Sequence, residues 1–163
     1  MTRVLVDNEK YFKEIYERNI DMVYRICSIY LKGNKANTED AVQNTFFKLL
    51  KSEKVFESIE HEKAWLITVA SNICKNMVSH WWNKKVPIDD IDIKDESGSD
   101  DEILKLLYML PDKYKKVIYL HYYEGYSGVE ISNLLGIKEN TIYSYLHVGR
   151  EKLKDILKEE ELV

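Results

Sequence analysis

A first group of candidate binding residues lies in residues 72–85. This stretch combines amide and basic groups with two indoles: Asn72, Lys75, His80, Trp81, Trp82, Lys84 and Lys85. Aromatic rings stack on unpaired bases, and lysines follow the phosphate backbone. The two adjacent tryptophans cannot point the same way, so at least one is expected to be exposed. That indole either contacts DNA or packs against the segment that follows.

A second group of candidate binding residues lies near the C-terminus. Away from Ile142 and Leu146, one helix is expected to expose Asn140, Thr141, Tyr143, Ser144, His147 and Arg150. Asn and Arg match the edges of adenine and guanine in the major groove, and Ser or Thr can pair with either. Lys138, Lys152 and Lys154 are better placed as phosphate anchors, which position a helix without reading sequence.

No pattern in the sequence supports catalysis. A nucleophile paired with a base, a glycine loop for phosphates and a metal-ligand spacing are all missing. Cys27 and Cys74 lie far apart without a CxxC motif, which favours two buried thiols over a disulfide framework or a zinc site. We therefore predict a binding protein with no catalytic residues, metal or cofactor, rather than a small helical enzyme.

The N-terminal part of the sequence has the periodicity of a helical bundle. Apolar residues recur at three- and four-residue spacing from Phe12 to Leu31, which predicts a long helix that ends near Gly33. Asn37 is the expected cap of a second helix. A polar loop over residues 52–62 should precede a third helix, Ala64 to Trp82, whose apolar side includes Trp65, Leu66, Val69, Ile73 and Met77.

The C-terminal part has the spacing of a helix-turn-helix. One helix is expected to open at Leu110-Pro111 and close at residues 124–125, with the stripe Tyr114, Val117, Ile118 and His121/Tyr122. A shorter helix should run from Ser127 to Leu135, with a turn at residues 136–138 and a second helix from about Glu139. Two core helices that merely meet at Gly136 are the alternative for this window.

Between these two parts, residues 86–102 hold eight Asp and Glu against one Lys, together with Pro87 and Gly98. Such a run repels itself and lacks a helical apolar period, so it predicts a flexible linker. The expected fold is all-α, with two small helical domains, 1–86 and 103–163, joined by an acidic linker at 87–102. The linker acts either as a solvated spacer or as a mimic of nucleic acid.

Three segments, read together, resemble an extracytoplasmic-function (ECF) sigma factor of the sigma-70 family. EDAVQNTFFKLLK is similar to conserved region 2.2, WLITVASNICKNMVSHWWNKK to regions 2.3 and 2.4, and the segment from Met109 to Lys154 to region 4. The resemblance covers about Phe12 to Leu157 and leaves no room for a region 3 domain. It implies a subunit that directs bacterial core RNA polymerase to promoters.

The resemblance also implies a role for each group of residues. Asp40, Gln43 and Asn44 would bind core polymerase; without the family match, an ordinary solvated helix side would be the favoured interpretation of such a trio. Residues 72–85 and the loop before their helix would bind the minus-ten promoter element, and the C-terminal group would read the minus-35 element. The acidic linker would lie in the polymerase's RNA channel, and an anti-sigma protein would be a further partner.

The sequence departs from the family pattern where basic residues are usual. Ser79, His80, Trp81 and Trp82 precede Lys84, and Tyr143, Tyr145 and Val148 lie in the recognition helix. Phosphate contacts are therefore expected to be fewer, and the promoter sequence is not predicted. A helix-turn-helix regulator that acts without polymerase is the rival function, but it leaves EDAVQNTFFKLLK unexplained.

The expected location is the cytoplasm, without insertion into a membrane. The N-terminus lacks the apolar core of a secretory signal, and no window approaches the roughly 18 uncharged apolar residues of a membrane span. The promoter DNA and the polymerase that the resemblance implies as partners fit this location.

Overall fold

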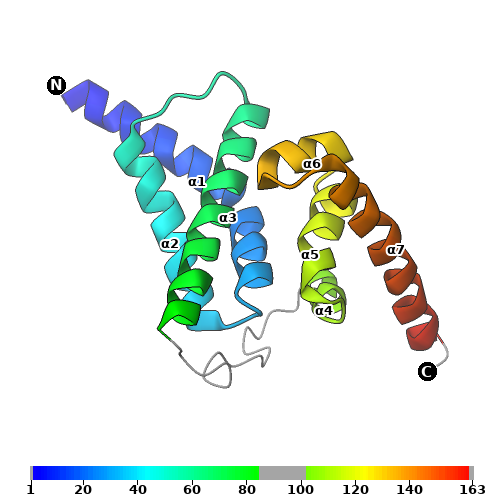
Figure 1. The fold of residues 1–163 in the computed structure, drawn as a ribbon. Coiled ribbons are helices and arrows are strands. Elements are labelled where there is room, and N and C mark those ends of the chain that lie inside the picture. Colours follow the sequence, from blue (N-terminus) through cyan, green and yellow to red (C-terminus); the bar gives the residue numbers. More distant parts are fainter. Residues whose placement is uncertain (1, 85–101, 162–163) are drawn as a thin grey trace. The chain divides into compact units, whose positions relative to one another are not determined.

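The chain folds into helices that form two compact units, residues 1–95 and 96–163 (Figure 1). The computed structural model describes residues 2–84 and 102–161, and side chains at 8–84 and 102–159. Strands are absent from these described ranges, so the all-α prediction is confirmed there. The predicted linker, 87–102, lies outside the described residues except for Glu102, and so does Lys85.

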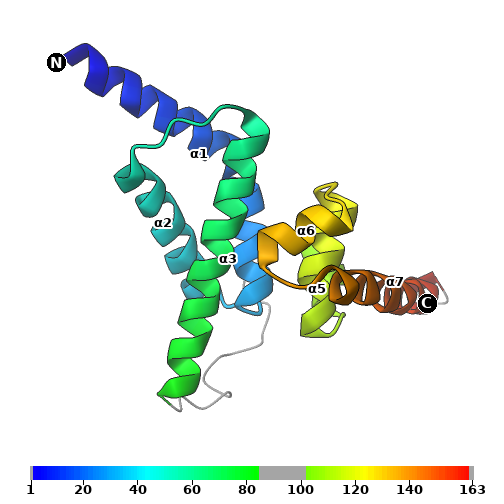
Figure 2. The ribbon, with the colours of Figure 1, turned by 45° about the horizontal axis from the view of Figure 1, so that its top comes forward.

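The first unit is a bundle of three helices, α1 (Thr2–Tyr30), α2 (Lys35–Ser52) and α3 (Ile59–Asn83), each packed against the other two. Figure 2 shows the long α1 and α3 with α2 beside them. Burial of apolar side chains from all three helices provides the stability of the bundle. Its core includes Ile15, Val23, Cys27, Leu31, Ala41, Phe46, Leu49, Leu66, Ile67, Ala70 and Cys74.

Two helix starts in this unit differ from the prediction. The cap of α2 is Asn34, whose side chain accepts a hydrogen bond from the Asn37 N–H at 3.0 Å, so Asn37 is the capped residue and not the cap. The cap of α3 is Ser58, whose Oγ accepts from the His61 N–H at 3.0 Å. Serine satisfies an otherwise unpaired amide there, and α3 begins five residues before the predicted Ala64.

The buried side of α3 also differs from the predicted apolar stripe. Leu66 is buried as expected, but Trp65, Val69, Ile73 and Met77 are half-buried. The core takes Ile67, Ala70, Ser71 and Cys74 instead. Apolar residues occur on more than one side of α3, so periodicity alone did not identify the side that packs against α1 and α2.

The second unit contains α4 (Glu102–Tyr108), α5 (Asp112–Ile118), a π-helical turn (Tyr119–Tyr123), α6 (Gly128–Leu135) and α7 (Glu139–Glu161). Helix α4 was not predicted. The π turn adds a residue to the helical turn, so Tyr119 and Leu120 are buried while the predicted His121 is half-buried and Tyr122 is 52% exposed. The predicted stripe was therefore wrong at its last position.

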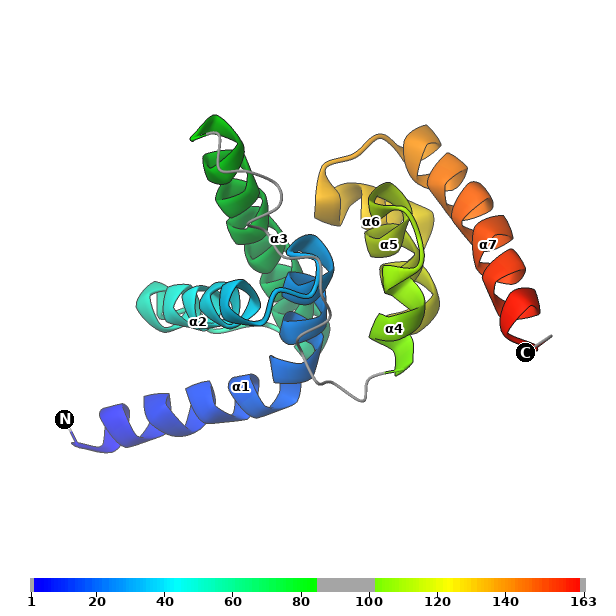
Figure 3. The ribbon, with the colours of Figure 1, turned by 90° about the horizontal axis from the view of Figure 1, so that it is seen from below.

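The helix-turn-helix prediction is confirmed. Ser127 and Glu130 form a reciprocal capping box at the start of α6, with each side chain bonded to the other's backbone N–H. Gly136 ends α6 with φ of 67°, a left-handed conformation that glycine adopts without steric cost. Figure 3 shows the turn that leads from α6 into α7, and α7 packs against both α5 and α6.

Candidate functional site

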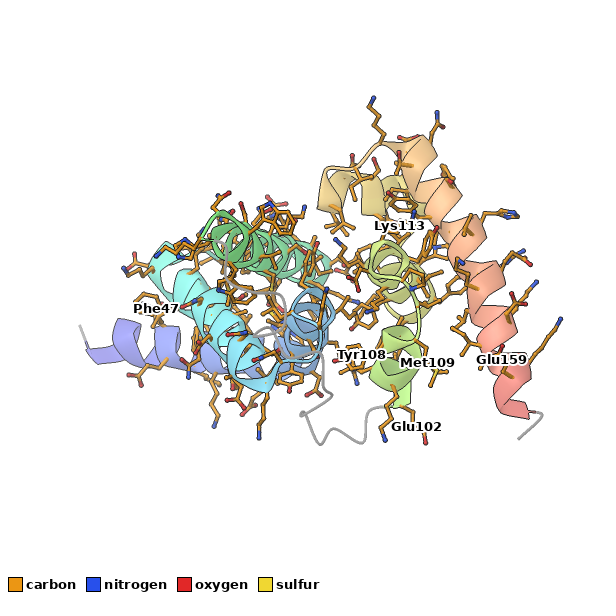
Figure 4. The ribbon with its side chains drawn as sticks, turned by 60° about the horizontal axis from the view of Figure 1, so that its bottom comes forward. Phe47, Glu102, Tyr108, Met109, Lys113 and Glu159 are labelled. Atoms are coloured by element: carbon orange, nitrogen blue, oxygen red, sulfur yellow. The ribbon has the colours of Figure 1, made fainter. Side chains whose placement is uncertain are left out.

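The predicted docking trio lies on the exposed side of α2. Asp40, Gln43 and Asn44 are all exposed, and their three- and four-residue spacing puts them on one helix face. The opposite side of α2, with Ala41 and Phe46, is in the core. Phe47 extends the exposed face by one turn and is 56% exposed (Figure 4), with the Lys51 ammonium 4.8 Å from its ring centroid. We call Asp40, Gln43, Asn44 and Phe47 the α2 face.

Helix α3 turns a second surface to solvent. Asn72 and Lys75 are exposed on the side opposite the buried Ala70 and Cys74, and His80 is exposed on the flank of the helix. The spacing of His61, Trp65, Asn72, Ser79 and Asn83 continues this side along the whole helix, which at 1.5 Å per residue is about 37 Å long. This strip, together with the end of the helix, is the α3 face.

At the end of α3 the two tryptophans diverge as predicted. Trp82 is 73% exposed, whereas Trp81 is half-buried. Lys84 follows as an exposed residue, and its backbone N–H donates to the His80 carbonyl at 3.1 Å. An exposed indole and an ammonium group are thus available within three residues of each other.

A cluster that the sequence analysis missed surrounds the loop between α2 and α3. The Phe56 ring lies 5.6 Å from the ring of Trp65 and 5.5 Å, edge to face, from the ring of His61. The Lys54 ammonium is 5.5 Å from the Trp65 centroid. Lys54, Phe56, His61 and Trp65 form what we call the loop cluster. Its sequence signal was an aromatic residue in a polar loop, followed by His61 and Trp65 at helical spacing in line with Asn72.

Beside this cluster, the side chain of Glu62 is buried. Its carboxylate accepts two hydrogen bonds from the Arg18 guanidinium at 2.8 and 2.9 Å and one from Asn19 Nδ2 at 2.7 Å. Burial by itself raises the pKa of Glu62, but the hydrogen bonds from Arg18 and Asn19 and the charge of Arg18 outweigh it and lower the pKa. This network fixes the start of α3 against α1.

In α7 the structure brings four of the predicted reading residues together. Asn140, Tyr143, Ser144 and His147 are exposed and follow one another at three- and four-residue spacing. We call them the α7 face. Arg150 continues this face at its edge, whereas Thr141 is half-buried and Lys152 is exposed on the flank of the helix. Lys138 is exposed in the turn before α7.

Two glycines set how closely α7 lies against its neighbours. A Cβ atom on Gly128 would lie 2.7 Å from the ring of Tyr143, so α6 supports that side chain of the α7 face. A Cβ atom on Gly149 would lie 2.9 Å from Ile118 and 3.2 Å from Tyr114 Cβ. Gly149 therefore allows the close contact of α7 with α5.

Metal-binding clusters and membrane-spanning helices are both absent from the described part of the chain. Within residues 2–84 and 102–161, no three His, Cys, Asp or Glu side chains gather as a metal site would require. None of the helices in the described part of the chain is both long and apolar enough to cross a membrane.

Family models match both units. The model for Sigma-70 region 2 matches residues 15–83, and the model for Sigma-70, region 4 matches residues 100–153. The chain is 29% identical to the ECF RNA polymerase sigma factor SigE of Mycolicibacterium smegmatis, over 88% of this chain and 60% of that protein. It is 26% identical to the ECF RNA polymerase sigma factor SigW of Bacillus subtilis, over 91% of this chain and 89% of that protein.

Solved structures agree with these matches. The sigma factor RpoE from Bartonella quintana, solved in complex with the anti-sigma factor NepR, has a TM-score of 0.69 at 25% identity, over 91% of this chain and 98% of that one. CnrH, solved with the cytosolic domain of CnrY, shares the fold with a TM-score of 0.58 at 17% identity. With a region 2 helix bundle, a region 4 helix-turn-helix and relatives of one type, the chain belongs to the sigma-70 family of RNA polymerase sigma factors, as an ECF sigma factor.

Proposed function

We propose that the protein binds core RNA polymerase through the α2 face and reads promoter DNA through the α3 and α7 faces. The observation that carries the proposal is the exposure of Asp40, Gln43 and Asn44 on one face, within the segment that matches region 2. Polar residues there add little to folding stability, which leaves them available for a partner. Transcription initiation places the protein in the cytoplasm.

For the minus-ten element, we propose that the α3 face and the loop cluster bind the opened strand. Unpaired bases expose their faces only after the duplex separates, and each base stacked on an aromatic ring contributes roughly 1–3 kcal/mol. The exposed Trp82 and the Trp65–Phe56 pair offer such surfaces at the two ends of the α3 face. Lys75 and Lys84 are placed to follow the phosphates, with His80 between them and Asn72 one turn before Lys75.

For the minus-35 element, the α7 face enters the major groove. The first turns of a recognition helix usually contact base edges, which assigns sequence reading to Asn140 and Ser144. Lys138 and Lys152 anchor phosphates on either side. Glu151 also points outward next to this face and pairs with Lys154 at 3.7 Å, which moderates its repulsion of the DNA backbone.

An anti-sigma protein is a further proposed partner. The relative from Bartonella quintana was solved with such a factor, and the fold matches over 91% of this chain. The rival function, a stand-alone helix-turn-helix regulator, is not favoured, because it gives no role to the unit that matches region 2.

Core binding tests the proposal. Asp40→Ala with Gln43→Ala should weaken retention on immobilised core polymerase at least tenfold, while the thermal unfolding midpoint stays within about 2 °C, because both side chains are exposed. The matched control is Lys13→Ala with Glu17→Ala, an exposed pair on α1 whose charges lie 3.8 Å apart. Equal retention of the wild type and both double variants would remove the docking role from the α2 face.

A further inference from the structure

Helix α1 presents a polar stripe to the loop between α2 and α3. Arg18 and Asn19 follow Tyr11 by seven and eight residues, which is about two helical turns. The three side chains therefore lie on one side of the helix. Figures 1 and 2 both show this loop beside the N-terminal half of α1. All three side chains bond to residues 56–62, which contain two members of the loop cluster.

The Tyr11 hydroxyl holds the middle of the loop. It accepts a hydrogen bond from the Phe56 backbone N–H at 3.0 Å. The two ends of the loop have local supports, because Ser52 Oγ accepts from the Lys54 N–H at 3.3 Å and Ser58 caps α3. A backbone N–H that is partly buried needs a partner, so the tyrosine hydroxyl determines where Phe56 lies.

The position of Phe56 in turn determines the geometry of the loop cluster. Its ring meets both His61 and Trp65, and the side chain is half-buried. Arg18 and Asn19 fix the other side of the cluster, since they hold Glu62, the residue after His61. Helix α1, which contributes no residue to the cluster, thus determines the positions of both of its sides.

We propose that Tyr11 is a positioning residue for promoter melting: its hydroxyl presents the loop cluster to an unpaired base without touching the DNA. This inference rests on the proposed binding of the opened minus-ten strand by the loop cluster. A pre-formed stacking surface binds a base more tightly than a mobile one, because less conformational entropy is lost on binding.

Tyr11→Phe isolates this role. The substitution keeps the aromatic ring and removes the hydroxyl, so the Phe56 N–H turns to water and the loop loses its central support. The matched control is Tyr16→Phe, which removes a hydroxyl one turn further along α1 from a tyrosine that is 40% exposed and stacks on Phe12. Neither substitution alters the apolar core of the bundle.

The experiment uses holoenzyme reconstituted from core polymerase and each full-length variant. Binding is measured on promoter DNA whose minus-ten region is pre-melted, with each exposed base varied in turn. Tyr11→Phe should weaken this binding about three- to tenfold, the factor expected for one net hydrogen bond, and flatten the preference between bases. Retention on core polymerase and preference in the minus-35 element should match those of Tyr16→Phe and wild type.

A double-mutant cycle with Phe56→Ala separates the inference from the proposed function. In the Phe56→Ala background, Tyr11→Phe should have no further effect, because the hydroxyl acts through the loop. If Phe56→Ala weakens binding but Tyr11→Phe behaves as Tyr16→Phe does, the positioning role is overturned and the loop cluster keeps its function. The role is likewise overturned if Tyr11→Phe acts equally in both backgrounds. If Phe56→Ala itself changes nothing, the minus-ten role of the loop cluster fails first.

Discussion

Glu62 shows how a single buried charge can order a surface that lies beside it. Three hydrogen bonds from Arg18 and Asn19 hold the Glu62 carboxylate in the bundle. The same contact stabilises the charged form of Arg18, because the hydrogen bond to Glu62 raises the pKa of the guanidinium. Charge-assisted bonds of this kind are about twice as strong as neutral ones. The start of α3, and with it His61, is therefore fixed by electrostatics as well as by packing.

This network predicts a loss of stability in acid. Because the folded-state pKa of Glu62 is lowered, its stabilising effect is complete above the ordinary pKa of about 4.3 and disappears as the pH falls through the lower folded value. Glu62→Gln should lower the free energy of unfolding by about 1–3 kcal/mol at pH 7. Urea unfolding at pH 7, 4 and 2.5 should show the wild type and variant converging. A constant difference between them at all three pH values would contradict the assignment.

The cysteines show what a sequence leaves open at this scale. Both were predicted to be buried thiols, and both are free and fully buried. Their partnership was not predictable, because 47 residues separate them and only the packing of α1 on α3 makes them neighbours. Contact with Cys74, and then burial, raise the pKa of the Cys27 thiol, so neither is expected to react while the bundle is folded.

The roles proposed for α7 divide its residues into those that read sequence and those that anchor phosphates. Substitution of Ser144 or Asn140 by alanine should change which minus-35 sequences are preferred, with about 1–3 kcal/mol lost for each good base pairing removed. Lys152→Ala should weaken binding to all promoters alike, because it removes a phosphate contact. It should also reduce by about one the slope of the logarithm of the binding constant against the logarithm of the salt concentration. Holoenzyme transcription from a randomised minus-35 element at two salt concentrations distinguishes the two effects.

In that experiment Lys158→Ala is the control, an exposed lysine near the end of α7. The placement of α7 in the groove would be wrong if Lys152→Ala changed the order of the preferred sequences, while Ser144→Ala and Asn140→Ala only lowered transcription from all sequences by the same factor.

Gly128 and Gly149 make a matched pair of substitution sites in the second unit. Gly149→Ala should lower the free energy of unfolding by about 1–3 kcal/mol, because its Cβ would be forced against Ile118 and the Tyr114 Cβ in a packed contact. In Gly128→Ala the added Cβ would contact the ring of Tyr143, but this ring is 51% exposed and can rotate outward. Stability should then change by less than about 1 kcal/mol, whereas minus-35 recognition should change. Thermal unfolding measures the stability of each variant, and promoter binding measures minus-35 recognition. Equal losses of stability in Gly149→Ala and Gly128→Ala would contradict this account.

At the scale of elements, sequence patterns predicted where helices occur better than they predicted which side of a helix packs or how the loops between helices fold. The helix-turn-helix was predictable because Ser127, Glu130 and Gly136 are local signals, each satisfied within a few residues. The side of α3 that packs was not, since Val69 and Ile73 are as apolar as the buried Ile67. Helix α4 is short and follows an acidic run, and the π turn at residues 119–123 depends on tertiary packing. The loop cluster was missed for the same reason, because loop geometry decides that Phe56 meets Trp65.

For the whole molecule, the distribution of charge fits the proposal that both units contact DNA. Residues 103–163 hold nine basic and nine acidic side chains, so the second unit gains little general attraction to DNA. The first unit, by contrast, offers both the α2 face and the α3 face. Two weak DNA contacts joined through a polymerase bind more tightly together than either does alone, which suits a subunit that depends on its complex.

Transcription by reconstituted holoenzyme tests the central claim most directly. Core polymerase and this protein should together produce discrete run-off transcripts from fragmented bacterial genomic DNA, whereas core polymerase alone should produce none at those positions. Their start sites should share two conserved elements at a fixed spacing, and mutation of either element should abolish the transcript. The account would be contradicted if the protein bound DNA specifically by itself while leaving the start sites used by core polymerase unchanged.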